Sequence, residues 1–322
     1  MSEYHTPVLL DESISALITN PNGIYVDATF GGGGHTAGIL SRLNQSGKVI
    51  AFDRDIDAID NKIDDERLVL IHNNFRFVHN YLSLEAFKSG EDIENAGADG
   101  ILADLGVSSH QFDTADRGFS FRYDAPLDMR MNKESAVSAK DIINGYEPKE
   151  LERIFRIYGE VDNAGRLARL IADARSKGEI GTTGELYNAI SPVLPKFAEH
   201  KYLAKVYQGL RIEVNGEMQA LEKFLYGAAR SLKPGGRLVI ITYQSLEDRM
   251  VKNFIKAGNI DGIEEKDFFG RKKAPLTAVN KKPILPKESE IAGNTRARSA
   301  KLRVAEKPEA NEAQAGKKEG SL

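Results

Sequence analysis

Near its N-terminus the chain reads Gly23-Ile24-Tyr25-Val26-Asp27-Ala28-Thr29-Phe30-Gly31-Gly32-Gly33-Gly34-His35-Thr36. A short apolar run ends in Asp27, four glycines follow, and a helical pattern then covers residues 37–43. A strand, a glycine-rich loop and a helix in this order are typical of a βαβ unit. Such a loop presents backbone N–H groups and a helix N-terminus to a ligand. The stretch therefore predicts an α/β fold with a cofactor beside the loop.

Two further apolar runs in the first hundred residues also end in an acid. One closes at Asp53 and the next at Asp104. Strands that alternate with helical patterns indicate a doubly wound parallel sheet, in which ligands bind outside the carboxyl ends of the strands. We therefore expect Asp27, Asp53 and Asp104 to face one crevice.

Two cofactors fit the glycine loop. Its residues satisfy the dinucleotide fingerprint as Gly32-x-Gly34-x-x-Ala37, with Asp53 further on to bind a ribose hydroxyl, which suits NAD. Asp27 favours S-adenosylmethionine, because a carboxylate just ahead of the glycines suits a cation such as the amino group of a methionine moiety. A third interpretation is that the loop only forms a tight turn. Glycine lowers the stability of a fold, however, and this interpretation does not explain why four glycines occur together.

The alternation of strands and helices stops after residue 114. Residues 115–214 place apolar side chains at three- and four-residue spacing, which predicts an inserted all-helical domain. The core domain is then discontinuous, with residues 1–114 and 215–306. Residues 307–322 are rich in Lys, Glu, Ala, Gly and Ser without a period, and they predict a disordered tail.

The composition excludes several classes of protein. The 322 residues are 41% hydrophobic and 28% charged, unlike a chain that is disordered throughout. There is no cysteine, so disulfide frameworks and cysteine nucleophiles are excluded. No window holds the roughly 18 apolar residues of a membrane span and no signal peptide is recognisable, so we expect a cytoplasmic protein. No histidine pair has metal-binding helical spacing, and we predict no metal. The oligomeric state stays open.

The distribution of charge is more informative than its total. The 44 Lys and Arg residues against 47 Asp and Glu residues give a net charge of −3, which by itself disfavours a nucleic acid partner. Residues 268–303, however, hold ten basic residues against two acids. This segment predicts a phosphate-binding surface whose contact with RNA weakens steeply with salt, and a solvated basic face is the alternative.

Motifs from one end of the chain to the other point to a single family. They lie at residues 5–12, 25–36, 103–111, 117–122, 126–131, 208–215, 234–238, 245–249 and 296–303. In this order they resemble the bacterial 16S ribosomal RNA cytosine-N4 methyltransferases, the MraW or RsmH family. The resemblance implies a Rossmann-like, S-adenosylmethionine-dependent sheet with an inserted helical domain that recognises the substrate. It also implies 16S ribosomal RNA within the small ribosomal subunit as the partner.

The resemblance further implies which residues bind S-adenosylmethionine. They are Gly33, Gly34 and His35 on the loop, Asp53 on the ribose, Phe75 against the adenine, and Asp104 and Gln111 closing the site. Without the resemblance, Phe75 is better interpreted as a core aromatic residue.

The chain departs from the family pattern at three positions. Gln244 stands where the family usually has His, so no role that needs a titrating imidazole is assigned there. Thr295 replaces a Pro, which affects a local turn, and Gly209 replaces an Ala, which bears on helix stability. Next to Gln244, Ser245 and Asp248 either contact substrate phosphate or cap the following helix.

The implied reaction needs a proton acceptor. The exocyclic N4 of cytosine is a poor nucleophile because its lone pair is delocalised into the ring. Asp104 is our candidate for the acceptor that localises this pair, and a carboxylate that only holds the cofactor is the alternative. Positioning of N4 in line with the departing sulfur would supply the rest of the rate.

A base must leave its stack to be methylated, and aromatic side chains commonly hold such bases. Phe119, Phe121 and Tyr123, interleaved with Arg117 and Arg122, are our candidates. A short strand that packs these rings into the core is an equal alternative.

Two other classes of function remain as rivals. An NAD oxidoreductase would keep the fold and the loop, but the chain offers no clear partner for hydride transfer. A non-catalytic RNA-binding factor would keep the basic segment, but it has no use for three acids beside a glycine loop.

Overall fold

The computed structural model describes residues 7–89, 97–106 and 117–309. The chain divides into two compact units. Residues 1–106 and 219–322 form the core unit, and residues 107–218 form the helical unit. In sequence, the helical unit is thus inserted between the two stretches of the core unit.

A seven-stranded sheet in the order β3-β2-β1-β4-β5-β7-β6 forms the centre of the core unit. Strands β1 to β5 pair in parallel, whereas β7 is antiparallel to β5 and β6. The predicted Rossmann-like α/β class is confirmed. The strand order reverses between β1 and β4, which is the point where sheets of this kind bind ligands. The strands are β1 (Ile24–Asp27), β2 (Lys48–Asp53), β3 (Leu68–His72), β4 (Ala98–Asp104), β5 (Leu232–Thr242), β6 (Thr277–Ala278) and β7 (Lys301–Glu306).

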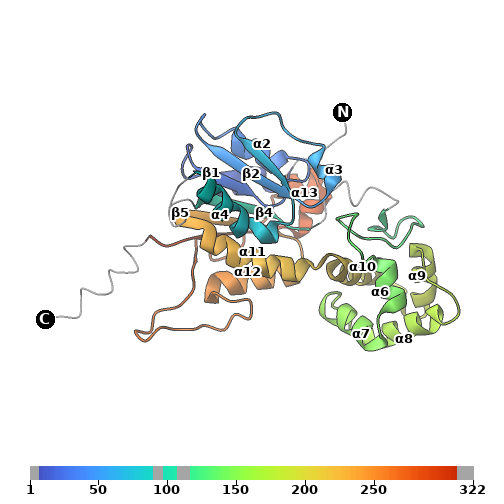
Figure 1. Ribbon diagram of the computed structural model, residues 1–322. Coiled ribbons are helices and arrows are strands. Elements are labelled where there is room, and N and C mark those ends of the chain that lie inside the picture. The colour runs from blue at the N-terminus through green and yellow to red at the C-terminus, as the bar shows by residue number, and fades with distance from the viewer. Residues whose placement is uncertain (1–6, 90–96, 107–116, 310–322) are drawn as a thin grey trace. The chain divides into compact units, whose positions relative to one another are not determined.

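Helices cover both faces of this sheet (Figure 1). On one face, Leu17 of α1 and Ile39 of α2 belong to the same buried cluster as Leu102 of β4. On the other face, Tyr81 of α4 packs edge-on against Phe52 of β2, with ring centroids 5.4 Å apart. The helices are α1 (Leu10–Leu17), α2 (Gly34–Leu40), α3 (Ile56–Ile59), η1 (Phe75–Phe77), α4 (Val78–Ser89), α11 (Glu217–Ser231), α12 (Ser245–Ala257), α13 (Glu288–Gly293) and η4 (Thr295–Ser299).

Several boundaries differ from the sequence expectation. Helix α2 begins at Gly34, three residues early, because Gly33 already serves as its N-cap. Strand β7 was not predicted, since its basic residues suggested only a phosphate-binding surface. Backbone hydrogen bonds of Lys307 with Gly235 and Gly236 extend the order beyond residue 306, so Lys307 is not part of a disordered tail. Residues 310–322 of that predicted tail lie outside the described residues.

The helical unit has its own apolar core, in which Phe155, Leu167 and Leu210 are fully buried. Capping boxes start helices of this unit, for example with Ser138 and Thr182 at the N-cap positions. Within the described part of this unit there are helices and one isolated bridge but no strand, which confirms the predicted all-helical insertion. The helices are α6 (Ala139–Gly145), α7 (Pro148–Ile157), α8 (Ala164–Arg175), α9 (Thr183–Ile190), η3 (Ser191–Val193) and α10 (Glu199–Asn215).

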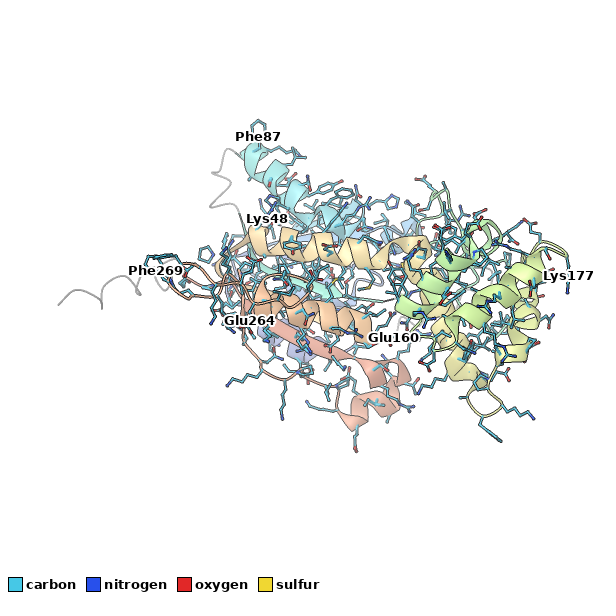
Figure 2. The ribbon with its side chains drawn as sticks, turned by 90° about the horizontal axis from the view of Figure 1, so that it is seen from below. Lys48, Phe87, Glu160, Lys177, Glu264 and Phe269 are labelled. Atoms are coloured by element: carbon cyan, nitrogen blue, oxygen red, sulfur yellow. The ribbon has the colours of Figure 1, made fainter. Side chains whose placement is uncertain are left out.

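The surface of the core unit exposes a few large rings. Phe87 near the end of α4 and Phe269 in the loop after α12 point outward and are 78% and 71% exposed (Figure 2). Phe268 packs edge-on against Phe269, with ring centroids 5.5 Å apart. None of the helices in the described ranges has the length and apolar character needed to cross a membrane.

The core unit's stability should depend on the cluster under α1 and α2. Leu102 is fully buried there, so Leu102→Ala removes buried methyl groups and leaves a cavity. We expect the free energy of unfolding to fall by about 2–5 kcal/mol. Leu285, which is 59% exposed, supplies the control, and Leu285→Ala should change it by less than about 0.5 kcal/mol. Urea titrations followed by circular dichroism make the comparison, and equal losses in the two variants would contradict it.

Candidate active site

The register of strands β1, β2 and β4 sets three acids at different heights on the carboxyl edge of the sheet. Asp27 pairs with Ala51 of β2 and with Leu102 of β4. Asp53 and Asp104 each lie two residues beyond those partners, so both project past Asp27. Side chains along a strand alternate with a period of two, so all three carboxylates start on the same face. The edge thus carries one recessed acid between two projecting ones.

The recessed acid, Asp27, is fully buried. One carboxylate oxygen accepts a hydrogen bond from the N–H of Thr29 at 3.0 Å, and the other accepts from the hydroxyl of Thr36 at 2.7 Å. Burial raises the pKa of Asp27, and the proximity of His35 together with these hydrogen bonds offsets part of the rise. The expectation that Asp27 faces a crevice and meets the cation of a ligand is therefore wrong. Its side chain instead ties the start of the glycine loop to α2.

The glycine loop is fixed between β1 and α2. The N–H of Phe30 donates to the carbonyl of Phe52 at 2.8 Å, which attaches the loop to β2. Gly31 and Gly33 have φ values of 53° and 77°, a region that residues with a side chain rarely adopt. These two glycines are therefore required by the path of the backbone.

Asp53 projects on the β2 side and fastens the loop. Its Oδ2 accepts from the N–H of Gly31 at 2.8 Å, and its Oδ1 accepts from the N–H of Asp55 at 2.9 Å. Burial raises the pKa of Asp53, and both hydrogen bonds oppose the rise. The side chain is half-buried, and each oxygen retains a second lone pair that a ligand hydroxyl can use.

Asp104 projects on the β4 side and meets two side chains from distant parts of the sequence. Its Oδ1 accepts from the hydroxyl of Tyr243 at 2.8 Å, and its Oδ2 lies 3.7 Å from Nδ1 of His35. Burial raises the pKa of Asp104, the nearby Asp27 adds to the rise, and His35 and Tyr243 oppose it. The side chain is still 23% exposed, so an approaching donor can reach it.

His35 and Gly34 are held by the residues just before α1. A Cβ on Gly34 would overlap Cγ of Pro7, so glycine is needed here for close packing of the chain on itself. Nε2 of His35 lies 3.2 Å from the carbonyl oxygen of Val8, which can only accept, so Nε2 is the donor. The nitrogen that faces Asp104 is therefore Nδ1.

The remaining predicted cofactor residues are Phe75 and Gln111. Phe75 lies in η1, and its partly buried ring packs edge-on against Phe224 with centroids 5.2 Å apart. The ring thus contributes to the packing under α11 while part of it remains accessible. Gln111 lies outside the described residues.

The aromatic candidates for holding a base separate into two kinds. Phe119 is 6% exposed and Phe121 packs against the same core, where its ring meets Tyr207 at 5.4 Å. Arg117 is buried and donates to backbone carbonyls of the helical unit. Core packing is therefore the correct interpretation for both phenylalanines, although neither lies in a strand. Only Tyr123, 62% exposed, is placed to meet a base.

The start of α12 is built differently from the predicted Ser245 cap. The buried carboxylate of Glu247 accepts from the N–H groups of Tyr243 and Gln244, at 3.1 and 3.2 Å. Gln244 is the N-cap residue, one position earlier than expected. Asp248 instead pairs with Arg303 at 2.7 Å, which joins α12 to β7.

Ion pairs neutralise much of the basic segment 268–303. Arg271, Lys272 and Lys273 pair with acids at residues 264–267, and Lys301 and Arg303 share Asp248. Lys281 and Lys282 are exposed, and within the described ranges no acid pairs with either. The charge available to a phosphate is therefore smaller than the sequence count suggests.

Tyr243 is the site residue that sequence reasoning missed. It directly follows the buried run 232–242, whose carboxyl end belongs to the same sheet edge as the three acids. That position was a usable signal. The hydroxyl's contact with Asp104 was not visible in the sequence, because it depends on the register between β4 and β5. In the described part of the chain, no cluster of three or more His, Asp or Glu side chains is arranged to hold a metal ion.

Comparisons with known proteins agree on one family. The model of the MraW methylase family matches residues 2–308. Ribosomal RNA small subunit methyltransferase H of Bacteroides fragilis (strain YCH46) is 52% identical over 304 residues, which cover 94% of this chain and 97% of that protein. The protein of the same name from Flavobacterium johnsoniae is 50% identical and covers 95% of this chain and 98% of its own length.

The burial of Asp27 gives a pH dependence that can be measured. Because its pKa in the folded state lies above the ordinary 3.8, its contribution to stability is complete below that value and is lost as the pH rises through the folded pKa. Asparagine keeps the shape but cannot ionise. The free energy of unfolding of Asp27→Asn, relative to that of the wild type, should therefore rise between about pH 4 and neutrality. The rise should be about 1.4 kcal/mol for each unit by which the pKa of Asp27 in the folded state exceeds its ordinary value. Urea titrations at several pH values test this, and a pH-independent difference would contradict it.

Proposed function

The chain belongs to the MraW methylase family, and on that basis we propose that it methylates the exocyclic N4 of one cytosine in the 16S ribosomal RNA of the small ribosomal subunit. The names of the curated relatives support ribosomal RNA of the small subunit as the substrate. The observation that carries the chemistry is Asp104, a projecting and partly exposed carboxylate beside the glycine loop. Such a substrate places the reaction in the cytoplasm.

S-adenosylmethionine is the cofactor that we propose for this edge of the sheet. When bound, it supplies a methyl group activated by attachment to a positively charged sulfur. The residues present fit it: Asp53 has lone pairs for ribose hydroxyls, and Phe75 keeps an accessible part of its ring for the adenine. Gly33, Gly34 and His35 form the loop and helix start beside it, and Gln111 completes the proposed set.

Asp104 acts in this proposal as the acceptor for a proton of the cytosine amino group. The hydrogen bond from N4 to the carboxylate draws the nitrogen lone pair out of the ring. That pair forms the new nitrogen–carbon bond, the carbon–sulfur bond breaks with its electrons going to sulfur, and the amino proton passes to Asp104. The charges balance, because the sulfonium loses its positive charge as the carboxylate loses its negative one. General-base assistance of this kind contributes about 10²–10⁴-fold to a rate.

We propose residues 115–214, which lie within the helical unit, as the substrate-recognition domain, with the core domain at 1–114 and 215–306. The support is chemical. Arg122 and Tyr123 are neighbours and both are exposed, which joins a phosphate-binding cation to a ring on which a base can stack. We propose these two residues for contact with the RNA.

Removal of the carboxylate tests the function. In Asp104→Asn, we expect methyl transfer to small-subunit 16S RNA to fall by about 10²–10⁴-fold while S-adenosylmethionine still binds. Transfer of radioactive methyl and calorimetric binding measure the two quantities. Asp60→Asn, at an exposed acid after α3, is the matched control and should keep wild-type transfer.

Two outcomes would overturn this assignment. Wild-type transfer by Asp104→Asn would leave Asp104 as a carboxylate that only holds the cofactor. Binding of NAD by the wild type, without binding of S-adenosylmethionine, would contradict the proposed function as a whole.

The unpaired lysines test the contact with RNA. Lys281→Ala combined with Lys282→Ala should weaken binding of the small subunit and lower the slope of log affinity against log salt by roughly 2. Lys272→Ala with Lys273→Ala, where Glu264 and Glu265 already neutralise the charges, should change the slope less. Filter binding over a salt series gives both slopes. Equal slopes in the two double variants would contradict the role of Lys281 and Lys282.

A further inference from the structure

Tyr243 continues the stepwise arrangement of the sheet edge. Asp104 pairs with Ile241 of β5, and Tyr243 lies two residues beyond Ile241. The neighbouring strand pair has the same offset, because Asp27 of β1 pairs with Leu102 of β4, two residues before Asp104. Side chains two residues apart start on the same face, so the register brings the phenol to the carboxylate. The contact is therefore a consequence of strand pairing.

We propose that Tyr243 is a positioning residue for methyl transfer, which holds Asp104 by one oxygen so that the other is aimed at the amino group of the substrate. This inference rests on the proposed function of Asp104. The phenol donates to Oδ1 at 2.8 Å. Among the residues that the structure describes, the group recorded beside Oδ2 is Nδ1 of His35, at 3.7 Å, which is longer than a hydrogen bond. One oxygen is thus occupied and the other is available to a proton.

The backbone around Tyr243 is held firmly enough for this task. Its N–H donates to the buried carboxylate of Glu247 at 3.1 Å. The N–H of Leu105 donates to the carbonyl of Ile241 at 2.9 Å, which locks the end of β4 to the end of β5. A Cβ on Gly106 would lie 3.3 Å from the ring of Tyr243, so the chain after Asp104 passes directly over the phenol. Both partners of the hydrogen bond are therefore anchored through their main chains.

The groups around the pair determine how the hydrogen bond acts on Asp104. Asp104 faces His35 from α2, the buried Asp27 at the end of β1, and Tyr243. The phenol is itself close to Glu247 of α12 and Glu290 of α13. Burial and these negative charges raise the pKa of Tyr243 far above its ordinary value, so the phenol remains a donor throughout the working range of pH.

Loss of the Tyr243 hydroxyl should therefore raise the pKa of Asp104. The hydrogen bond from Tyr243 lowers the pKa of Asp104 against the effect of burial. In Tyr243→Phe the ring remains but this donor is gone, so the pKa of Asp104 rises and the carboxylate is protonated at higher pH. Since only the ionised form accepts a proton, the acidic limb of the rate profile should move to higher pH, by roughly one unit for a hydrogen bond to a charged group.

The experiment compares kcat and KM for methyl transfer to small-subunit RNA over a pH series. For Tyr243→Phe, we expect an acidic limb shifted upward by roughly one pH unit and kcat about tenfold lower on that limb. KM for S-adenosylmethionine and the thermal midpoint should stay near the wild type, because the ring and its packing are kept. Tyr226→Phe, on α11 with its ring against Phe254, removes a hydroxyl elsewhere and should leave the profile unchanged.

The possible results separate this inference from the proposed function. A profile for Tyr243→Phe that coincides with the wild type, while Asp104→Asn is inactive, would overturn the positioning role and leave the function standing. A fall in kcat without a shifted acidic limb, accompanied by a lowered thermal midpoint, would also overturn it, since that pattern reports a structural loss. If the wild type itself transfers no methyl group to the RNA, the proposed function fails.

Discussion

The pairing register of four parallel strands is the constraint on which the rest of the site depends. Asp104 lies two residues beyond Leu102, the residue that pairs with Asp27, and Tyr243 lies two residues beyond Ile241, the residue that pairs with Asp104. Each polar side chain therefore starts on the same face of the sheet as the previous one and further toward its carboxyl edge. A slip of one residue between β1 and β4 would turn Asp104 to the opposite face. Since both faces are covered by helices, such a slip would bury the acid among apolar side chains. The apolar core therefore fixes the geometry of the polar edge.

The recessed acid shows how the loop is built. Asp27 has no exposed surface, and it accepts hydrogen bonds from Thr29 and Thr36 that connect the start of the glycine loop to α2. Asp53 holds the same loop to β2 by accepting a hydrogen bond from the N–H of Gly31. These bonds stabilise two carboxylates whose pKa values burial has raised. The loop is thus pre-formed, and binding of a cofactor need not order it.

The sequence predicted the parallel strands, the helical insertion and the three acids, because strongly periodic apolar runs and terminal carboxylates are local signals. It predicted the use of Asp27 wrongly. An open carboxylate at that position would have favoured S-adenosylmethionine over NAD; since Asp27 is buried, family membership is what favours S-adenosylmethionine. The contact of Tyr243 with Asp104 and the pairing of Asp248 with Arg303 could not be predicted, since both depend on how elements far apart in the chain pack together. The count of charges in residues 268–303 likewise could not show which lysines were already paired.

In the proposed function, this sheet edge places one methyl group on N4 of one cytosine. Mass spectrometry of 16S ribosomal RNA from cells that lack the chain, compared with cells that regain it, tests this claim most directly. We predict the loss of a single methyl group from the exocyclic nitrogen of one cytosine, and its return with the wild-type chain. An unchanged methylation pattern in the deletion, or a missing methyl group on a ring carbon or a ribose, would contradict the account.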